Sequence, residues 1–592
     1  FRRSMPAVQH PRRPLQTDLL ILIKQKEKAM KLKGYITAAA FLSTVLLTAQ
    51  TEDETIRRSV TLYNPYKPTL QQADKRALLP EIDDTTTVPI RFSYDFTPGS
   101  FVPEYEVSPI KSAVLSPEPL PGLKKGYVNL GLGTYLSPFL EVSISNGRSK
   151  SGAIGLFTRT FGSAGKIELE NDKRVNAGFL DNQALLYGKK YFRRSRLDAD
   201  IDFRHMTRHA YGYDPDVTGY EPDKKDIRAL YYDLSGKARY FTMETDSSEL
   251  IWDATLRYNM FRRQGDGLQH NPGLTLSAGT EMFGLYGGLN AEYDLYLFSK
   301  EIDHKARSLF SVAPYITKGN EDWRFRFGVK VAADLKENHD ALVGGDRKMY
   351  LYFYPDAMFT FRIIPKFLRF NASIDGFMEN NQARNSAYVN PWMLPGDTLW
   401  NLRTTDNELR IKAGLSGSVN VTSSYAFDVS YNLFKDMLLF MNDTTGVGNW
   451  FVPVYADGSL LKVHGGLNIP LNRQLTLSLD GNYYGYNLSG QEYAWHKPKW
   501  DGSLRGDYNL RNKIIASAQL TLTGDRYARV RAPEETVRLP FHANLNLGVE
   551  YRYTPDISFW LKCNNVSYSR YFEWNYYPSR NFMLLGGISY SL

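Results

Sequence analysis

From Gly126 to the C-terminus, the sequence repeats a single pattern in which apolar and polar side chains alternate over segments of about ten residues or more. Between Trp323 and Lys336, the odd-numbered residues are apolar and the even-numbered ones are mostly charged or small. The same alternation closes the chain, because one apolar or glycine face is formed by Phe582, Leu584, Gly586, Ile588, Tyr590 and Leu592. A final strand with one apolar face is typical of a barrel that leaves no strand edge in lipid.

Counting the segments predicts about twenty-two strands. They lie near 126–135, 136–146, 151–161, 183–193, 195–212, 227–243, 247–262, 269–283, 284–299, 304–318, 321–336, 347–363, 365–381, 406–423, 424–441, 449–469, 471–487, 494–509, 511–526, 539–553, 555–569 and 575–592. Their connections fall into two alternating classes. Short turns, as at 422–424, 470–473, 510–512 and 554–556, alternate with longer loops near 213–226, 337–346, 382–405, 488–493 and 527–538. This asymmetry separates the periplasmic turns from the extracellular loops of outer-membrane barrels.

Composition agrees with a β-barrel and excludes a helical membrane protein. Aromatic residues make up 14% of the chain, with forty tyrosines, while the mean hydropathy is −0.40. No run reaches the roughly 18 apolar residues that a spanning helix needs. We therefore expect an all-β fold: a large antiparallel transmembrane β-barrel over residues 126–592, in the outer membrane and in contact with its lipid.

The N-terminal residues predict a leader and a separate arm. Residues 30–49 have a charged start, an apolar stretch and a small-residue exit, which are the marks of a signal peptide. Residues 1–29 begin with Phe and resemble translated upstream sequence. Residues 50–125 contain ten prolines between Pro65 and Pro121, so we expect an extended arm. It is interpreted as a periplasmic or lumenal lead-in, or as a binding site for a periplasmic or lipoprotein partner.

Charge and cysteine content narrow the functional classes further. Residues 1–33 hold nine Lys/Arg and two Asp/Glu, a net +7 of the chain's +9, so the remainder carries only +2. We therefore expect no nucleic-acid partner, which would need a basic face. Cys563 is the only cysteine, so neither an internal disulfide nor a multi-thiolate metal site can form.

The sequence has no G-x-S-x-G elbow, no H-E-x-x-H pair and no P-loop, so we expect a non-enzyme with no catalytic, cofactor-binding or metal residues. His205 and His209 share a predicted strand face, but about 13 Å of strand separates them, which is too far for one metal ion. A solvated or interface pair is the favoured interpretation.

Charged residues line several predicted lumen faces, for which a wet wall is favoured over a substrate track. They are Asp198, Asp200, Asp202, Arg204, Arg324, Arg326 and Lys330. The loop from Trp392 to Trp400 is compatible with stacking on a sugar ring, but loop tryptophans more often pack locally or at membrane level.

The last thirty residues resemble the closing hairpin of TonB-dependent receptors. The matching elements are Asn565-Val566 followed by Tyr571, then Tyr577-Pro578-Ser579-Arg580-Asn581-Phe582, and finally Gly587, Tyr590 and Leu592. In that family, N-L/V-x-x-x-x-Y and Y-P-x-x-R-x-F elements open the last strand before a terminal G-x-x-Y-x-F/L. The predicted strand count agrees with the twenty-two strands of that transporter class.

The resemblance has two departures. The family carries a plug domain of well over a hundred residues, whereas about 75 separate Gln50 from the predicted barrel, so a conventional plug does not fit. The stretch Val60-Thr61-Leu62-Tyr63-Asn64-Pro65-Tyr66-Lys67-Pro68-Thr69-Leu70, followed by Gln72-Ala73-Asp74-Lys75, resembles the N-terminal part of plugless, receptor-like barrels of Bacteroidota. Asp53-Glu54-Thr55-Ile56 is similar to the start of a TonB box, but Arg57 and Arg58 interrupt it, which favours an ordinary mature N-terminus. The resemblance implies solute transport across the outer membrane, with TonB as a weakly supported partner. The alternative is a non-enzymatic scaffold or assembly subunit that binds its partners through the arm.

Overall fold

The computed structural model describes residues 124–147, 150–243, 250–302, 304–337, 347–420, 422–443, 446–530 and 535–592. The predicted signal peptide at 30–49, the segment at 1–29 and all but the last two residues of the arm at 50–125 lie outside the described residues. The predictions for these segments therefore stay predictions.

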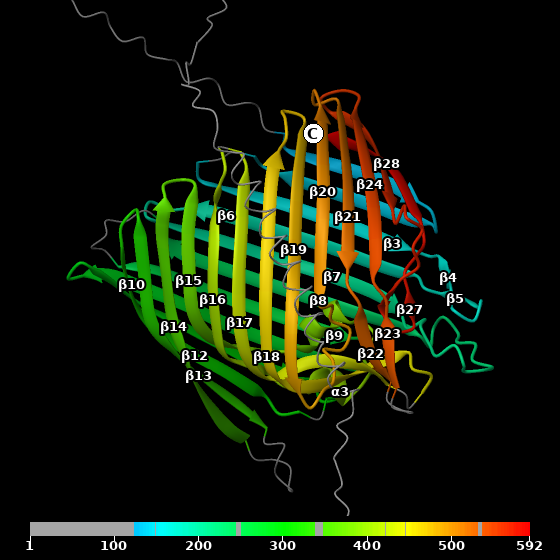
Figure 1. Ribbon diagram of the computed structural model, residues 1–592, viewed down its shortest axis with the longest axis horizontal. Coiled ribbons are helices and arrows are strands. Elements are labelled where there is room, and N and C mark those ends of the chain that lie inside the picture. Colours follow the sequence, from blue (N-terminus) through cyan, green and yellow to red (C-terminus); the bar gives the residue numbers. More distant parts are fainter. Residues whose placement is uncertain are drawn as a thin grey trace, which may run out of the picture. The chain divides into compact units, whose positions relative to one another are not determined.

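Twenty-two antiparallel strands form a closed barrel (Figure 1). In chain order they are β1 (Gly126–Gly133), β2 (Ser137–Ser145), β3 (Gly152–Ser163), β6 (Phe179–Tyr191), β7 (Ser195–His209), β8 (Arg228–Thr242), β9 (Ile251–Arg263), β10 (Gly267–Met282), β11 (Leu285–Phe298), β12 (Arg307–Gly319), β13 (Trp323–Glu337), β14 (Arg347–Ile364), β15 (Leu368–Glu379), β16 (Thr405–Ser418), β17 (Ser424–Asp443), β18 (Trp450–Pro470), β19 (Leu475–Ser489), β20 (Trp500–Leu510), β21 (Ile514–Thr523), β24 (His542–Arg552), β25 (Ile557–Asn564) and β28 (Met583–Ser591).

The remaining described elements lie in the connections. They are the hairpin of β4 (Lys166–Glu168) and β5 (Arg174–Asn176), helices α2 (Ala383–Val389) and α3 (Asp397–Trp400), the hairpin of β22 (Arg526–Val530) and β23 (Glu535–Leu539), and the pair β26 (Phe572–Trp574) and β27 (Tyr577–Pro578). Among the described residues, no helix has the length and apolar character needed to cross a membrane.

The last strand closes the barrel on the first, as its alternation predicts. β1 and β28 pair antiparallel, with Val128 opposite Tyr590 and Leu130 opposite Ile588. The Leu592 carbonyl oxygen accepts a hydrogen bond from the Lys125 N–H at 2.8 Å. These pairs satisfy the backbone groups of both strands, so no edge is left open along the seam.

The alternation separates a lipid face from a lumen face. Outward side chains are apolar and exposed, as for Leu132 at 62%, Phe327 at 61% and Ile588 at 50%. Inward neighbours are polar or small, and Asp334 on β13 is fully buried. An exposed apolar belt around a closed barrel is stable only in lipid, and it places the protein in the outer membrane.

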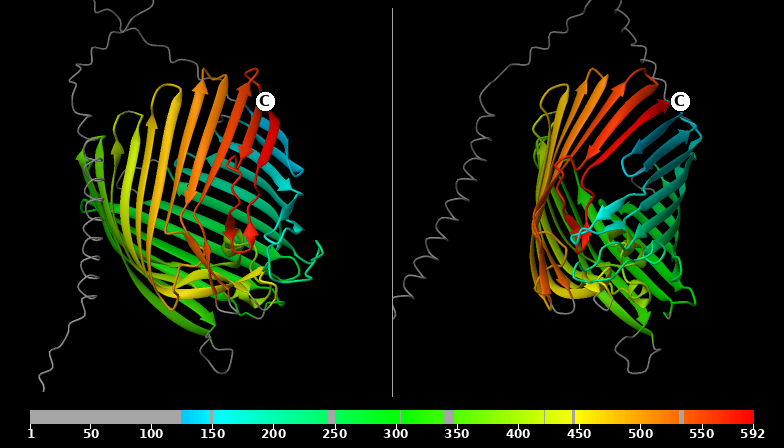
Figure 2. Two further views of the ribbon diagram at one scale, coloured as in Figure 1. Left: turned by 45° about the vertical axis from the view of Figure 1, so that its right-hand side comes forward. Right: turned by 90° about the vertical axis from the view of Figure 1, so that its right-hand side faces the viewer.

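The two ends of the barrel differ, also as predicted. The end that holds Leu592, here called the turn end, carries only connections of eight residues or fewer. The opposite end, here called the loop end, carries longer ones: 164–178, 210–227, 380–404, 490–499 and 565–582. Residues 338–346 of the loop predicted at 337–346 lie outside the described residues. Figure 2 shows the C-terminus at the turn end and the short helices at the loop end.

Three predicted strand bounds need correction. The strands predicted at 494–509, 555–569 and 575–592 are shorter, because β20 begins at Trp500, β25 ends at Asn564 and β28 begins at Met583. The removed residues belong to loops at the loop end. They carry buried side chains, such as Trp495, Asn565 and Tyr577, whose contacts lie within and between the loops and not along the barrel wall.

Strand length varies around the barrel. β17 and β18 have 20 and 21 residues, whereas β1 and β25 have eight each and β2 and β28 have nine. The seam between β1 and β28 therefore lies in the shortest part of the wall.

An aromatic side chain spans this seam on the lumen side. Trp560 of β25 lies over Gly587 of β28 and Gly131 of β1, so close that a Cβ on either glycine would lie about 2.4–2.5 Å from its ring. Its indole N–H donates to Asn129 Oδ1. Trp560 thus links β25 to β1 across β28, and it packs edge-on against Phe139 of β2.

Candidate functional site

Residues 380–404, here called the inserted segment, connect β15 to β16 and cross the lumen at the loop end. On one side, the Tyr231 hydroxyl of β8 donates to the Pro391 carbonyl at 2.7 Å and Arg263 of β9 donates to the Met393 carbonyl at 2.8 Å. On the other side, Met393 forms a parallel bridge with Phe451 of β18. β8 and β18 lie in well separated parts of the wall, so the segment closes the space between them.

The inserted segment is held by a core of aromatic and aliphatic side chains. Met393 and Leu399 are fully buried. Trp392 stacks on Tyr577 with ring centroids 4.0 Å apart, and its indole N–H donates to the His209 carbonyl at 2.9 Å. Both tryptophans of the sequence prediction are buried: Trp392 packs locally in this way, and the ring of Trp400 lies 6.1 Å from that of Phe261.

A buried carboxylate fastens α2 to the wall. Asp233 of β8, only 2% exposed, accepts hydrogen bonds from Arg384 Nε at 2.7 Å and from the Tyr388 hydroxyl at 2.8 Å. Both donors come from α2, and a third comes from Asn259 of β9 at 2.8 Å. Charge-assisted hydrogen bonds of this kind are stronger than neutral ones and fix the helix orientation.

The loop at 565–582 completes the closure from the seam side. The hydroxyl of Tyr577 donates to the Asn449 carbonyl, and the hydroxyl of Tyr211 donates to the Pro578 carbonyl at 3.1 Å. Asn565, which is buried, donates to the carbonyls of Ser569 and Arg580 at 2.8 and 2.9 Å. The N-L/V and Y-P elements of the sequence resemblance therefore shape this loop, and β28 begins only after them.

A neutral histidine lies at the centre of the packed loops. His496 of loop 490–499 faces the Phe440 carbonyl through Nδ1 at 3.1 Å, and its Nε2 accepts from the Asn575 N–H at 3.4 Å. Its ring lies 4.8 Å from that of Trp574 and 5.5 Å from that of Phe451. Burial lowers the pKa of His496 from 6.5 to about 3, because a charged imidazolium would lose its hydration there.

The predicted lumen residues do line the lumen, mostly as ion pairs with neighbours. Arg204 lies 2.8 Å from Asp202, and Arg326 lies 2.6 Å from Asp356 on β14. Asp198 is paired with Arg196 at 2.6 Å. Pairs of the same kind recur on other strands, including Arg239 with Asp253, Arg257 with Glu292 and Asp294, Arg307 with Asp334, and Arg410 with Asp375. This arrangement fits the wet wall better than a track of free charges.

The two predicted histidines have separate surroundings. His205 Nδ1 lies 3.1 Å from Asn182 Nδ2, and its ring lies 5.0 Å from that of Tyr232. His209 is buried, and its Nδ1 bonds to the Gly178 carbonyl. Of the two predicted alternatives, a solvated or an interface pair, the solvated one does not hold for His209. Within the described ranges, no group of three metal-binding side chains comes together.

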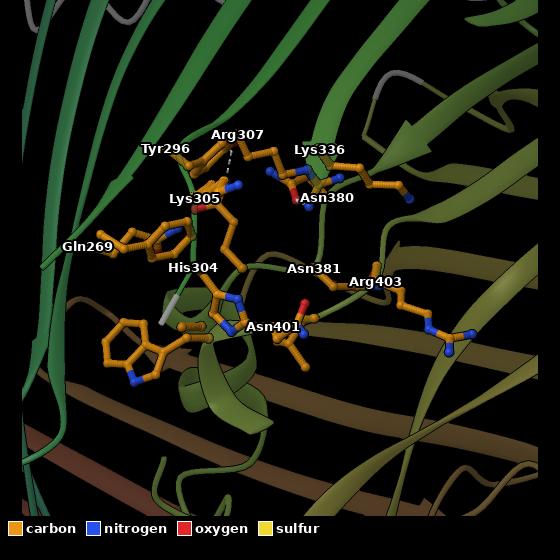
Figure 3. Close-up of a pocket in the computed structure, with 15 residues that line it drawn as sticks. Gln269, Tyr296, His304, Lys305, Arg307, Lys336, Asn380, Asn381, Asn401 and Arg403 are labelled. Carbon is orange, nitrogen blue, oxygen red and sulfur yellow. Dashed lines mark hydrogen bonds between the residues drawn. The ribbon is translucent and has the colours of Figure 1, made fainter. Parts of the chain in front are cut away.

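A basic pocket lies between the inserted segment and the walls of β10 to β13. Figure 3 shows Arg307, Lys336 and Asn380 along one side of it and His304 and Asn401 along the other. Its guanidinium groups are already partnered: Arg307 makes two bonds to Asp334 at 2.9 and 2.7 Å, and Arg403 bonds to Asp436 at 3.2 Å.

A second, larger cavity lies on another side of α2, toward β16 to β18. It has a volume of about 260 Å³, and its lining includes Asn381, Asn385, Asn407, Asn432 and Lys497. We call it the amide pocket. Sequence reasoning predicted a long loop at 382–405 but missed both pockets and the course of this loop across the lumen. The only available signals were the asparagines at 380, 381, 385 and 390 and the two tryptophans, which have no strand period.

Comparison with known proteins establishes the fold. No protein-family model matches the chain, and no curated protein does. Among solved structures, the FrpB iron transporter of Neisseria meningitidis is similar with a TM-score of 0.60 and 11% identity, over 80% of this chain and 82% of that one. The pyoverdine outer membrane receptor FpvA of Pseudomonas aeruginosa gives a TM-score of 0.58 and 10% identity, over 79% and 78%.

The ferric-catecholate import receptor Fiu of E. coli K12 is also similar, with a TM-score of 0.56 and 8% identity over 80% of this chain and 82% of that one. At such identities the likeness shows a common fold. The chain has a TonB-dependent-receptor-like outer-membrane barrel, and it is located in the outer membrane.

Proposed function

We propose that this protein is a non-enzymatic transport channel of the outer membrane, whose lumen is closed at the loop end by the inserted segment. The observation that supports the proposal is the position of residues 380–404. They contact β8 and β9 on one side of the lumen and β18 on the other. The lumen wall carries paired charges, and the barrel is closed at the loop end. This arrangement suits a solute channel whose loop end opens only when the inserted segment moves.

The likeness to an iron transporter and two receptors supports transport as the class of function. This proposal includes three further points from the sequence: an origin in Bacteroidota, the lack of a conventional plug domain, and TonB as a partner. Asp53-Glu54-Thr55-Ile56 is the candidate contact for TonB, in an arm that lies outside the described residues. The rival function is a non-enzymatic scaffold or assembly subunit that binds periplasmic or lipoprotein partners through residues 50–125, and it rests on that same arm.

Conductance in planar bilayers tests the channel. The full chain should conduct poorly, and a variant whose residues 383–400 are replaced by a short Gly-Ser linker should conduct well, either alone or with residues 50–125 also removed. Replacement of the hairpin residues 526–539 is the matched control, because it leaves the inserted segment intact. If no variant conducts although each runs as a folded barrel, transport is rejected and the scaffold is favoured.

A further inference from the structure

A further cavity lies at the loop end, beside the β4–β5 hairpin. Three segments that are distant in the sequence line it: this hairpin, loop 565–582 and the turn between β1 and β2, which contributes Tyr135. Its volume of about 420 Å³ lies within the roughly 300–1,000 Å³ of ligand sites. We call it the β4–β5 pocket.

The charges of the β4–β5 pocket are not balanced. Four cationic side chains and one anionic side chain line it, a net charge of +3: Lys166, Arg174, Arg570 and Arg580 against Glu168. The amide pocket, by contrast, has one lysine and one glutamate in its lining. Like charges that are held together repel one another, so an anion that enters the β4–β5 pocket relieves this repulsion.

Three of the four cations have no carboxylate within 4.0 Å in the part of the chain that the structure describes. Arg174 is the exception, because its Nε lies 3.0 Å from Glu168 Oε2. The lumen wall is different, since many of its arginines occur in pairs such as Arg326 with Asp356 at 2.6 Å. The β4–β5 pocket therefore lacks the internal compensation of charge that the wall has.

Neutral acceptors hold two of these cations in place. Arg570 donates to the Glu168 carbonyl at 2.7 Å, which joins loop 565–582 to the β4–β5 hairpin. Arg580 donates to Ser163 Oγ at 2.6 Å and to the Ala177 carbonyl. Burial lowers the pKa of Arg580, because its guanidinium has lost hydration and gained no carboxylate. Both arginines are thus held in position, and their charges are not neutralised within the described residues.

We propose that the β4–β5 pocket binds the phosphate group of a phosphate monoester. This inference goes beyond the channel function and holds whether or not the barrel conducts. A monoester phosphate carries about −1.5 to −2 charges and three acceptor oxygens at pH 7. Arginine forks bind such oxygens in pairs, and lysine binds them as a point charge. Lys166 and Arg570 are exposed, so their N–H groups are accessible to a ligand. A ligand with a single negative charge would leave most of the net +3 uncompensated.

Calorimetric titration of the full chain in a non-ionic detergent tests the site. Glucose 6-phosphate is the probe, glucose is its neutral counterpart, and gluconate is its counterpart with one negative charge. Glucose 6-phosphate should bind and glucose should not. Gluconate should bind at least about tenfold more weakly than glucose 6-phosphate, the effect of one lost hydrogen bond between charged groups.

The double variant Lys166→Gln/Arg570→Gln removes two exposed cations of the pocket and should weaken the binding of glucose 6-phosphate at least about tenfold. Lys224→Gln/Lys225→Gln is the matched control. It removes the same charge from exposed residues of loop 210–227, at the same end of the barrel but outside the pocket lining, and should leave binding unchanged. The mobility of unboiled protein on a gel shows whether each variant is folded.

Glu168→Gln should have the opposite effect. It removes the only carboxylate of the pocket lining and keeps a side-chain oxygen for Arg174. Glucose 6-phosphate should then bind roughly two- to fivefold more tightly, the effect of one exposed charge. Glu170→Gln is the control, because Glu170 lies in the turn between β4 and β5 and outside the pocket lining. A purely structural part for these charges predicts no gain in affinity.

A phosphate monoester can belong to a free solute or to a lipid headgroup, and mass spectrometry distinguishes the two sources. The full chain is reconstituted in nanodiscs of phosphatidylcholine and phosphatidic acid and then extracted into detergent. Phosphatidic acid that stays on the full chain but not on Lys166→Gln/Arg570→Gln assigns the site to a lipid headgroup. Binding of glucose 6-phosphate without retained phosphatidic acid assigns it to a solute.

The phosphate site is overturned if neither glucose 6-phosphate nor phosphatidic acid binds the full chain. It is also overturned if gluconate binds as tightly as glucose 6-phosphate, or if the folded Lys166→Gln/Arg570→Gln variant binds the phosphate probes as the full chain does.

Discussion

Arg384 of α2 donates to Asp233 of β8 at 2.7 Å, and this bond joins the inserted segment to the lumen wall at a carboxylate that is nearly fully buried. A channel must break this bond if its outer end is to open by movement of residues 380–404. The pair therefore marks where the closed state can be weakened without touching the barrel.

Asp233→Asn should loosen the inserted segment. The substitution removes the charge that holds Arg384, and hydrogen bonds to charged groups are worth about 1.5–3 kcal/mol each. We expect faster proteolytic cleavage within 380–404 and more frequent channel opening. Asp253→Asn breaks a comparable wall pair, with Arg239, and is the control. Equal effects of the two substitutions would contradict a special part for Asp233.

Acid should loosen the packed loops through His496. Its folded pKa of about 3 lies below the 6.5 of an unburied imidazole, so the buried neutral ring contributes fully above pH 6.5. This contribution is lost as pH falls from 6.5 toward 3, by up to about 1.4 kcal/mol per unit. Cleavage within 490–499 should thus accelerate with acid, and His496→Gln should flatten that dependence. An unchanged profile in the variant would refute it.

Gly587→Ala should destabilise the seam. A Cβ at this position would lie 2.1 Å from the Leu130 carbonyl oxygen and 2.4 Å from the Trp560 ring, so backbone or indole must move. We expect a lower temperature for the loss of the heat-modifiable band on a gel. Gly465→Ala on β18 meets no atom within 4 Å and serves as the control. Identical melting of the two variants would show that the seam tolerates the added carbon.

Tyr590→Asp combined with Leu592→Asp should impair membrane insertion. Both side chains face outward and are 46% and 48% exposed, so the change puts two carboxylates on the lipid face of the closing strand. Gel mobility without boiling measures the folded fraction. Ser589→Asp combined with Ser591→Asp alters the lumen face of the same strand, and it should insert better. A normal folded fraction of the Tyr590→Asp/Leu592→Asp variant would show that membrane insertion does not depend on the apolar outer face of β28.

The barrel wall could be predicted because lipid and water impose a two-residue period on every strand. Phe327 and Gly328 show the rule in one step, since the first is 61% exposed on the outside and the second is buried inside. All twenty-two predicted segments correspond to a strand of the barrel. The errors fall where an aromatic-rich loop, such as 570–580, contains strand-like residues that pack inside the lumen.

The candidate site could not be predicted, because it depends on contacts between distant segments. Asp233 and Arg384 are 151 residues apart, and Trp392 and Tyr577 are still further apart. Neither pair produces a periodic pattern in the sequence. The tryptophans at 392 and 400 did single out the right loop, but nothing local indicated that this loop turns into the lumen instead of outward.

The eight residues of β1 have a consequence for the surrounding lipid. At about 3.3 Å per residue and a tilt of about 40°, such a strand rises roughly 20 Å, less than the apolar band of about 25 Å that an outer-membrane barrel usually presents. β18, with 21 residues, rises more than twice as far. Acyl chains beside β1 and β28 must therefore shorten to match the wall, so the bilayer is thinnest where the barrel is joined.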